Sequence, residues 1–159
     1  MEHYIQAFVN GSKEVFRDLC NTEIKAGRAF FVTKYEFEKS WDVSGIIGLS
    51  GEVKGVVAIS FKESTALKLA KNLTGIEYIF IDNNVTDVIG EIANIITGNV
   101  KNIFEKKYRV KISIPSIFKG NSHAVIWSTT NTRIISIPFS IFENQEFCLS
   151  VAMEKGVME

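Results

Sequence analysis

Asp87, Glu91 and Asn94 are the residues whose types and spacing most clearly suggest chemistry. Their spacing of i, i+4 and i+7 places the three side chains on one face of an α-helix. A carboxamide both accepts and donates hydrogen bonds, so Asn94 could orient an attacking water. Glu91 could act as a base or hold a cationic side chain of a partner. With no second catalytic group beside it, this pair makes a poor self-contained hydrolase.

The helix that carries these residues has an apolar stripe on its opposite side. At about 100° per residue, the stripe falls within about 80° of one direction. It contains Val85, Val88, Ile89, Ile92, Ile95, Ile96 and Ile103. The opposite direction holds Asp87, Glu91, Asn94, Gly98, Lys101 and Glu105. We expect this second set to face solvent, where charged residues are common without any function.

Small residues interrupt the polar side of this helix: Gly90, Ala93, Thr97 and Gly98. A glycine inside a helix costs about 1 kcal/mol relative to alanine. We expect Gly90 and Gly98 to lie away from the buried face, leaving a flat surface on which a partner could dock. The predicted partner-binding residues are Asp87, Gly90, Gly98 and Lys101. Asp87 is more typical of a first-turn acid stabilised by the helix dipole than of a catalytic group.

Other familiar sites are missing from the sequence. His3 and His123 have no paired His or Cys at metal-ligand spacing, so no metal site is predicted. Neither a phosphate-binding loop nor a dinucleotide fingerprint is present, and the 48–51 segment reads as a hairpin turn. Cys20 and Cys148 are isolated and typical of buried, reduced thiols.

Composition restricts the class of protein. The chain has 159 residues, of which 46% are hydrophobic, enough for a core. The 18 basic and 18 acidic residues cancel, which argues against general attraction to nucleic acid or to an anionic membrane. No apolar run is long enough to span a bilayer, and polar residues interrupt the N-terminus, so no signal peptide is expected. These features predict a cytoplasmic protein.

Periodicity predicts mixed secondary structure. Helices are expected over 3–20, 64–74 and 85–106, and strands over 28–38, 42–50, 53–61, 108–114, 122–130, 132–141 and 146–153. Gly75 should close the second helix, and Asp82-Asn83-Asn84 should cap the third. Residues 76–81 read as a short extended piece. No Pro- or Ser-rich linker divides the chain, so residues 1–159 are predicted to form one domain.

A weak internal repeat relates residues 1–80 to 81–159 at an offset of 80. At this offset Ile46-Ile47 falls on Ile126-Trp127, and the Gly51 turn falls on Asn131. The repeat predicts an α+β, pseudo-twofold duplicated domain with two long helices packed on an antiparallel sheet. The counterparts of the polar set in the first helix would be Ala7, Gly11 and Glu14, so the acid–amide pair occurs once.

The run Asp87-x3-Glu91-x2-Asn94, followed by Pro115, resembles the signature of the CheC/CheX/FliY phosphatases of bacterial chemotaxis. Residues 90–98 match the usual helix text of that family, while 6–16 resemble its first helix and 46–51 its central hairpin. The resemblance covers roughly residues 1–155. CheC-type members typically carry the pair on both long helices, whereas CheX carries it only on the second. This chain is therefore most similar to CheX.

The resemblance implies a CheC-like fold and a phosphatase of a phosphorylated CheY-type response regulator, which carries an aspartyl phosphate. Asn94 would orient the attacking water, and Glu91 would pair with a lysine of the regulator. The regulator would bring Mg²⁺, so the chain would need no metal or cofactor of its own. The family also implies a homodimer.

Two alternatives remain. A non-enzymatic CheC-like or flagellar-switch adaptor would bind a receiver domain through the same helix face without hydrolysis. An unrelated α+β domain would bind no receiver domain. The intact pair of Glu91 and Asn94 favours the phosphatase, since an adaptor has no need to keep both.

Overall fold

The computed structural model describes residues 2–32, 40–125 and 132–154. The helices are α1 (Glu2–Cys20), α2 (Glu63–Thr74) and α3 (Asn83–Phe104). The strands are β1 (Ile24–Ala26), β2 (Phe30–Phe31), β3 (Trp41–Gly51), β4 (Gly55–Phe61), β5 (Val110–Ile112), β6 (Ser116–His123), β7 (Thr132–Ile141) and β8 (Gln145–Glu154). None of the described helices is long and apolar enough to cross a membrane.

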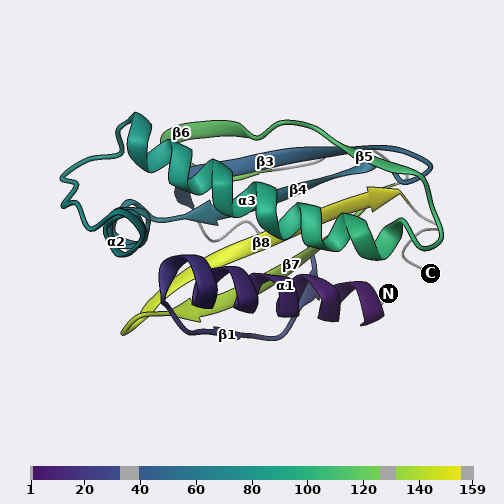
Figure 1. Ribbon diagram of the computed structural model, residues 1–159, viewed down its shortest axis with the longest axis horizontal. Helices are drawn as coiled ribbons and strands as arrows, with labels where there is room; N and C mark the ends of the chain where they lie inside the picture. Colours follow the sequence, from purple (N-terminus) through teal and green to yellow (C-terminus); the bar gives the residue numbers. More distant parts are fainter. Residues whose placement is uncertain (1, 33–39, 126–131, 155–159) are drawn as a thin grey trace.

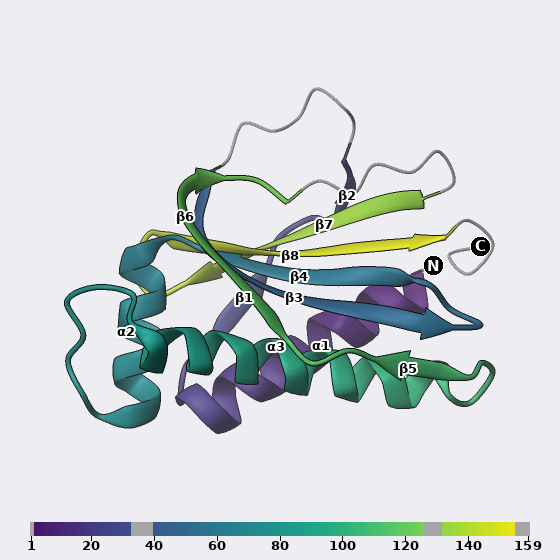
Figure 2. The same cartoon turned by 90° about the horizontal axis from the view of Figure 1, so that it is seen from above.

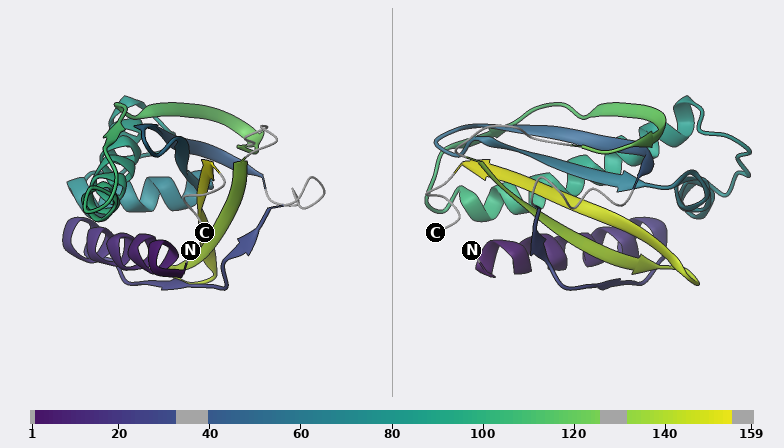
Figure 3. Two further views of the ribbon diagram at one scale, coloured as in Figure 1. Left: turned by 90° about the vertical axis from the view of Figure 1, so that its right-hand side faces the viewer. Right: turned by 180° about the vertical axis from the view of Figure 1, so that it is seen from behind.

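The strands form one antiparallel sheet with the order β1-β7-β8-β4-β3-β5. Off this path, β2 pairs with β7 and β6 pairs with β3. Both long helices, α1 and α3, lie side by side on one face of the sheet, as Figures 1 and 3 show. The shorter helix α2 lies at one end of α3, and β6 crosses the outer edge of the sheet (Figure 2).

Each half of the chain follows the same plan of a long helix, short strands and a hairpin. The β3–β4 and β7–β8 hairpins meet through the β4–β8 pair. The short strands of each half pair with the hairpin of the other half, β1 and β2 with β7, and β5 and β6 with β3. This arrangement confirms the predicted pseudo-twofold α+β fold with two long helices on an antiparallel sheet.

The single repeat offset of 80 is wrong for the strands. Strand β3 begins at Trp41 and β7 begins at Thr132, a separation of about 90 residues. The second half has a longer helix, and the segment between that helix and its hairpin is also longer. The counterparts proposed for Ile46-Ile47 and Gly51 fall within 126–131, outside the described residues.

Most predicted elements are present, and the structure differs from the prediction in several strands. The 132–141 strand is confirmed with its predicted bounds. The strand expected over 122–130 begins instead at Ser116, because pairing with β3 imposes extended backbone on a sequence of low strand propensity. Residues 76–81, predicted as a short extended piece, are irregular and join no sheet. Of the 28–38 stretch, only β2 is a strand within the described part.

The cap residues act as predicted, whereas the 48–51 segment belongs to strand β3 rather than to the turn that follows it. Gly75 is left-handed at φ 76° and donates its N–H to the Lys71 carbonyl, which ends α2. Asp82 accepts a hydrogen bond from the Val85 N–H at 3.0 Å, which starts α3. Gly51, the last residue of β3, has φ 108°, and a Cβ there would lie 2.4 Å from the Arg109 carbonyl oxygen, so the end of this strand requires glycine.

The core between helices and sheet contains a group of stacked aromatic rings from both halves. The rings of Phe139 and Phe147 are 4.9 Å apart and nearly parallel, and Phe16 of α1 lies 4.8 Å from Phe147. Phe61 of β4 stacks on the same ring at 5.1 Å. Each buried phenylalanine contributes about 2 kcal/mol or more relative to exposure. This cluster fixes α1 on the sheet and joins the two hairpins.

Candidate functional site

The outer face of α3 presents the predicted acid–amide pair to solvent. Asp87, Glu91 and Asn94 are all exposed, as the angular pattern predicts. Within the described residues, no hydrogen bond or ion pair joins any of these three side chains to another group. All three are therefore available to a molecule that approaches this face.

Close packing on the sheet holds α3 in place beneath this face. Ile89, Ile92 and Ile96 are fully buried. A Cβ on Gly45 of β3 would lie 3.2 Å from the Ala93 Cβ and 3.3 Å from the Ile89 side chain. Glycine at position 45 therefore lets the helix backbone lie close to the strand. Such tight packing makes α3 a rigid base for its exposed residues.

Gly90 is buried, contrary to the prediction that it lies on the exposed face. A Cβ there would lie 3.6 Å from the Pro115 Cβ and 3.5 Å from the Ile117 Cδ1. The error arose because a helix wheel does not include the segment before β6, which covers this side of α3. Pro115 therefore packs on Gly90, directly beside Glu91.

The flat surface predicted from small residues is reduced to Gly98. A Cβ at Gly98 would meet no atom within 4 Å, so this position borders open space. Ala93 and Thr97 are buried, and the Thr97 hydroxyl donates to the Ala93 carbonyl. Lys101, predicted to bind a partner, forms an ion pair with Glu105 at 2.7 Å.

The burial of the two long helices gives a better register for their comparison than the offset of 80. Adding 81 to the number of a buried α1 residue gives a buried α3 residue for most of the helix: Ala7, Phe8, Val9, Gly11, Ser12, Val15 and Phe16 match Val88, Ile89, Gly90, Ile92, Ala93, Ile96 and Thr97. The counterparts of Asp87, Glu91 and Asn94 are thus Gln6, Asn10 and Lys13. The acid–amide pair is still absent from α1.

An exposed apolar loop beside the site was not predicted to be functional. Between α2 and α3, the side chains of Ile76, Ile79 and Phe80 are exposed. Pattern reasoning assigned these residues to an extended piece because they are apolar. The stretch between the Gly75 cap and the Asp82 cap is too short to pair in the sheet. Its short length is the feature of the sequence that indicates an exposed loop.

The other reactive side chains serve the structure. His123 has its Nδ1 2.7 Å from the Gly120 carbonyl and its Nε2 2.7 Å from the Ser44 Oγ. Ser44 is fully buried, so this Ser–His contact links β6 to β3 rather than forming an accessible nucleophile. Burial raises the pKa of the Cys20 thiol to about 11, which keeps it protonated and unreactive at neutral pH.

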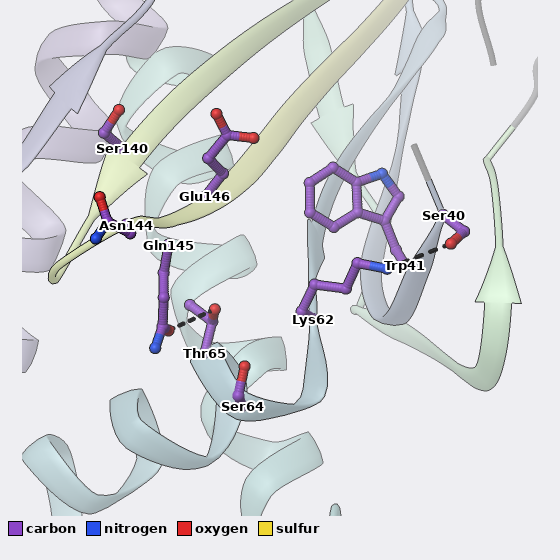
Figure 4. Close-up of a pocket in the computed structure, with 9 residues that line it drawn as sticks. All are labelled: Ser40, Trp41, Lys62, Ser64, Thr65, Ser140, Asn144, Gln145 and Glu146. Atoms are coloured by element: carbon purple, nitrogen blue, oxygen red, sulfur yellow. Dashed lines mark hydrogen bonds between the residues drawn. The ribbon is translucent and has the colours of Figure 1, made fainter. Parts of the chain in front are cut away.

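A cleft of about 740 Å³ lies between the start of α2 and the β7–β8 turn (Figure 4). Trp41 and Lys62 line it, and the Lys62 Nζ donates to the Ser40 Oγ at 3.3 Å. Across the cleft, the Thr65 hydroxyl donates to the Gln145 side-chain carbonyl at 2.8 Å. Among the described residues, the lining is mostly hydroxyl and amide groups, with no pair of carboxylates to act as acid and base.

The chemistry available to the α3 face is limited to positioning. Among the described residues, no group of three or more His, Cys, Asp or Glu side chains could hold a metal ion. Asn94 can orient water, and Glu91 can pair with a cation, but neither is next to a nucleophile. A reaction at this face therefore needs a partner that supplies the reacting group.

Comparison with known proteins agrees with this geometry. The family model described as chemotaxis phosphatase CheX matches residues 43–140. CheY-P phosphatase CheX of Thermotoga maritima is 27% identical over 154 residues, 96% of each chain. Chemotaxis protein CheX from Vibrio vulnificus superposes with a TM-score of 0.86 at 27% identity, covering 96% of this chain and 99% of that one. A CheX–CheY–BeF3–Mg²⁺ complex from Borrelia burgdorferi gives a TM-score of 0.77 at 26% identity, covering 96% and 98%. The chain therefore belongs to the chemotaxis phosphatase CheX family.

Proposed function

We propose that this protein accelerates hydrolysis of the aspartyl phosphate of a CheY-type response regulator in chemotaxis. The observation that carries the proposal is the pair of Glu91 and Asn94, exposed and unpaired within the described residues, on the rigid outer face of α3. Membership of the CheX family and similarity to a relative named CheY-P phosphatase support the same reaction.

Asn94 is the proposed catalytic residue because its carboxamide can orient a water in line with the scissile P–O bond. The water oxygen attacks phosphorus, and the aspartyl oxygen leaves as the carboxylate of the regulator, which yields inorganic phosphate. An acyl phosphate has a good leaving group, so orientation of the water can remove several kcal/mol of barrier. Glu91 pairs with a lysine of the regulator and fixes the register in which Asn94 enters.

The chain requires no metal of its own in this proposal, since Mg²⁺ arrives bound to the regulator. The complex from Borrelia burgdorferi is consistent with this arrangement, because its name includes CheY, BeF3 and Mg²⁺. Removal of Mg²⁺ by a chelator should therefore abolish turnover, while the melting temperature of the isolated protein stays unchanged.

We also propose that the protein works in the cytoplasm as a homodimer. Strand β6 lies at the sheet edge and carries an exposed Phe118, 54% accessible, which would be covered by a second copy. The molar mass in solution, measured by light scattering, tests the dimer.

The experiment that tests the reaction is a phosphate-release assay with purified, phosphorylated CheY-type regulators. Asn94→Ala should lower the rate about 100-fold, since it removes the group that orients water. Glu91→Ala should lower it about tenfold through weaker docking. Asn10→Ala is the matched control, because Asn10 is an exposed amide at the equivalent region of α1.

The result also separates phosphatase from adaptor. A wild-type protein that binds the phosphorylated regulator without shortening the lifetime of its phosphate would be an adaptor. Absence of binding to any receiver domain would point to an unrelated α+β domain.

A further inference from the structure

A groove of about 450 Å³ lies beside the catalytic face, between the end of α2, the following loop and the first turns of α3. One wall is apolar and contains Leu73, Ile76 and Tyr78. The other wall contains Asp87, Val88 and Glu91. Glu91 belongs to both the groove and the acid–amide pair, so the two surfaces are continuous.

The loop that forms the apolar wall is held at both ends. Lys71 forms an ion pair with Glu77 near the end of α2. At the other end, Ile81 is buried and its carbonyl accepts a hydrogen bond from the Lys119 Nζ at 3.0 Å. Fixed ends leave little entropy to lose when a partner binds.

Three apolar side chains of this loop are nevertheless exposed. Ile76, which lines the groove, is 57% accessible. Ile79 and Phe80 are 88% and 59% accessible and belong to the same loop outside the groove lining. Burying such a side chain contributes roughly as much as burying one in a core, so an apolar patch on a rigid loop is a natural docking surface.

The second wall needs a cation. Asp87 and Glu91 are one turn apart on α3, where like charges repel. Neither forms an ion pair within the described residues. No lysine is among the groove's described lining residues, and Lys71 and Lys119 bind Glu77 and the Ile81 carbonyl. A partner that brings basic groups to this wall would relieve the repulsion.

We propose that this groove docks the response regulator, and the proposal rests on the function proposed above. The regulator places an apolar side chain against Ile76 and Tyr78, and a basic side chain of its own against Asp87. Asp87 and the loop thus set affinity and the choice of regulator, while Asn94 sets the chemical rate. The two carboxylates favour a basic protein surface as the occupant over an anionic membrane.

The test uses Ile76→Ser and Asp87→Asn in the full chain. Both residues are exposed, so the fold should survive. Turnover is measured by phosphate release at increasing phospho-regulator concentration, and binding by calorimetry with the beryllofluoride-activated regulator. We expect about a tenfold rise in KM and Kd for Ile76→Ser and about a threefold rise for Asp87→Asn, with kcat within about twofold.

Two further comparisons sharpen the result. Salt should weaken binding less in Asp87→Asn than in the wild type, because one ion pair is missing. Phe30→Ser is the matched control, since Phe30 is 44% accessible on β2, which pairs only with β7 among the described strands. This variant should leave KM and Kd unchanged.

Unchanged KM and Kd in both groove variants would overturn the docking proposal. Dissociation of a dimer by Ile76→Ser with an unchanged regulator Kd would overturn it too, because the groove would then be an interface between copies. If the wild type binds the regulator without hydrolysing its phosphate, and the groove variants lose that binding, docking stands and the proposed phosphatase function fails.

Discussion

Helices α1 and α3 bury matching residues against the same sheet but differ at the exposed positions equivalent to the acid–amide pair. At four of its exposed positions, α1 carries Gln6, Asn10, Lys13 and Arg17, which are neutral or basic and mostly long. At the equivalent positions, α3 has Asp87, Glu91, Asn94 and Gly98, which are acidic or short. The sheet constrains one side of each helix, while the other side is free to specialise.

The flanks of the two helices differ as well. Pro115 packs on Gly90 of α3, whereas the equivalent α1 residue is Val9, whose side chain is itself buried. The exposed loop that ends at Asp82 leads directly into α3. Helix α3 therefore combines short exposed residues with neighbouring segments that border them. Substitutions at the exposed residues or at these neighbours test why α3, and not α1, carries the site.

The largest expected effect concerns transfer of the pair to α1. In an Asn94→Ala background, Asn10→Glu with Lys13→Asn rebuilds the acid–amide spacing on the equivalent face. We expect phosphate release to stay about 100-fold below the wild type, because α1 lacks the groove that positions the regulator. Recovery of more than a tenth of the wild-type rate would show that the pair alone is sufficient. Circular dichroism controls for folding.

An intermediate effect, on stability, is expected where Pro115 packs on Gly90 of α3. Gly90→Val introduces the residue type found at Val9 in α1, and its methyl groups would collide with Pro115 and Ile117. We expect a loss of about 2 kcal/mol in the free energy of unfolding, measured in urea. Gly90→Ala is the matched control, since its Cβ would be in ordinary contact with both neighbours. Equal stability of the two variants would contradict the role of Pro115 as a packed wall.

The smallest effect is expected at Gly98, where the absence of a side chain keeps the surface of α3 low. Gly98→Ala should raise the free energy of unfolding by about 0.5–1 kcal/mol, because a Cβ there meets open space and the helix gains rigidity. Gly98→Arg introduces the α1 residue type of Arg17 and should raise KM severalfold by obstructing the regulator. If both variants left KM unchanged, Gly98 would lie outside the docking surface.

Sequence reasoning predicted the helices well because their apolar periodicity is strong. It also identified Asp87, Glu91 and Asn94 as an exposed set from spacing alone. It placed Gly90 on the wrong side, since the covering segment before β6 comes from outside the helix and follows no local pattern. The groove could not be predicted for the same reason, because its walls meet only after α2 and α3 pack together.

The repeat shows a related limit. Spacing suggested a duplication, and the topology has that form, but insertions between helix and hairpin changed the offset from about 80 to about 90. The pattern of buried residues still aligns α1 with α3, because equivalent positions of both helices pack on the same sheet. The polar residues on the exposed face of α3 could thus be predicted from the sequence. The segments that surround this face could be identified only from the tertiary structure.

The position of β8 in the sheet has a consequence for how the protein is made. This strand is the last along the described chain, yet it lies between β7 and β4 in the middle of the sheet. During synthesis the first half cannot complete its sheet, and the open edge of β4 waits for a partner about 90 residues later. Contacts between such distant residues slow folding, which is expected to take milliseconds to seconds. Removal of the β8 segment should therefore leave an aggregating chain rather than a smaller phosphatase.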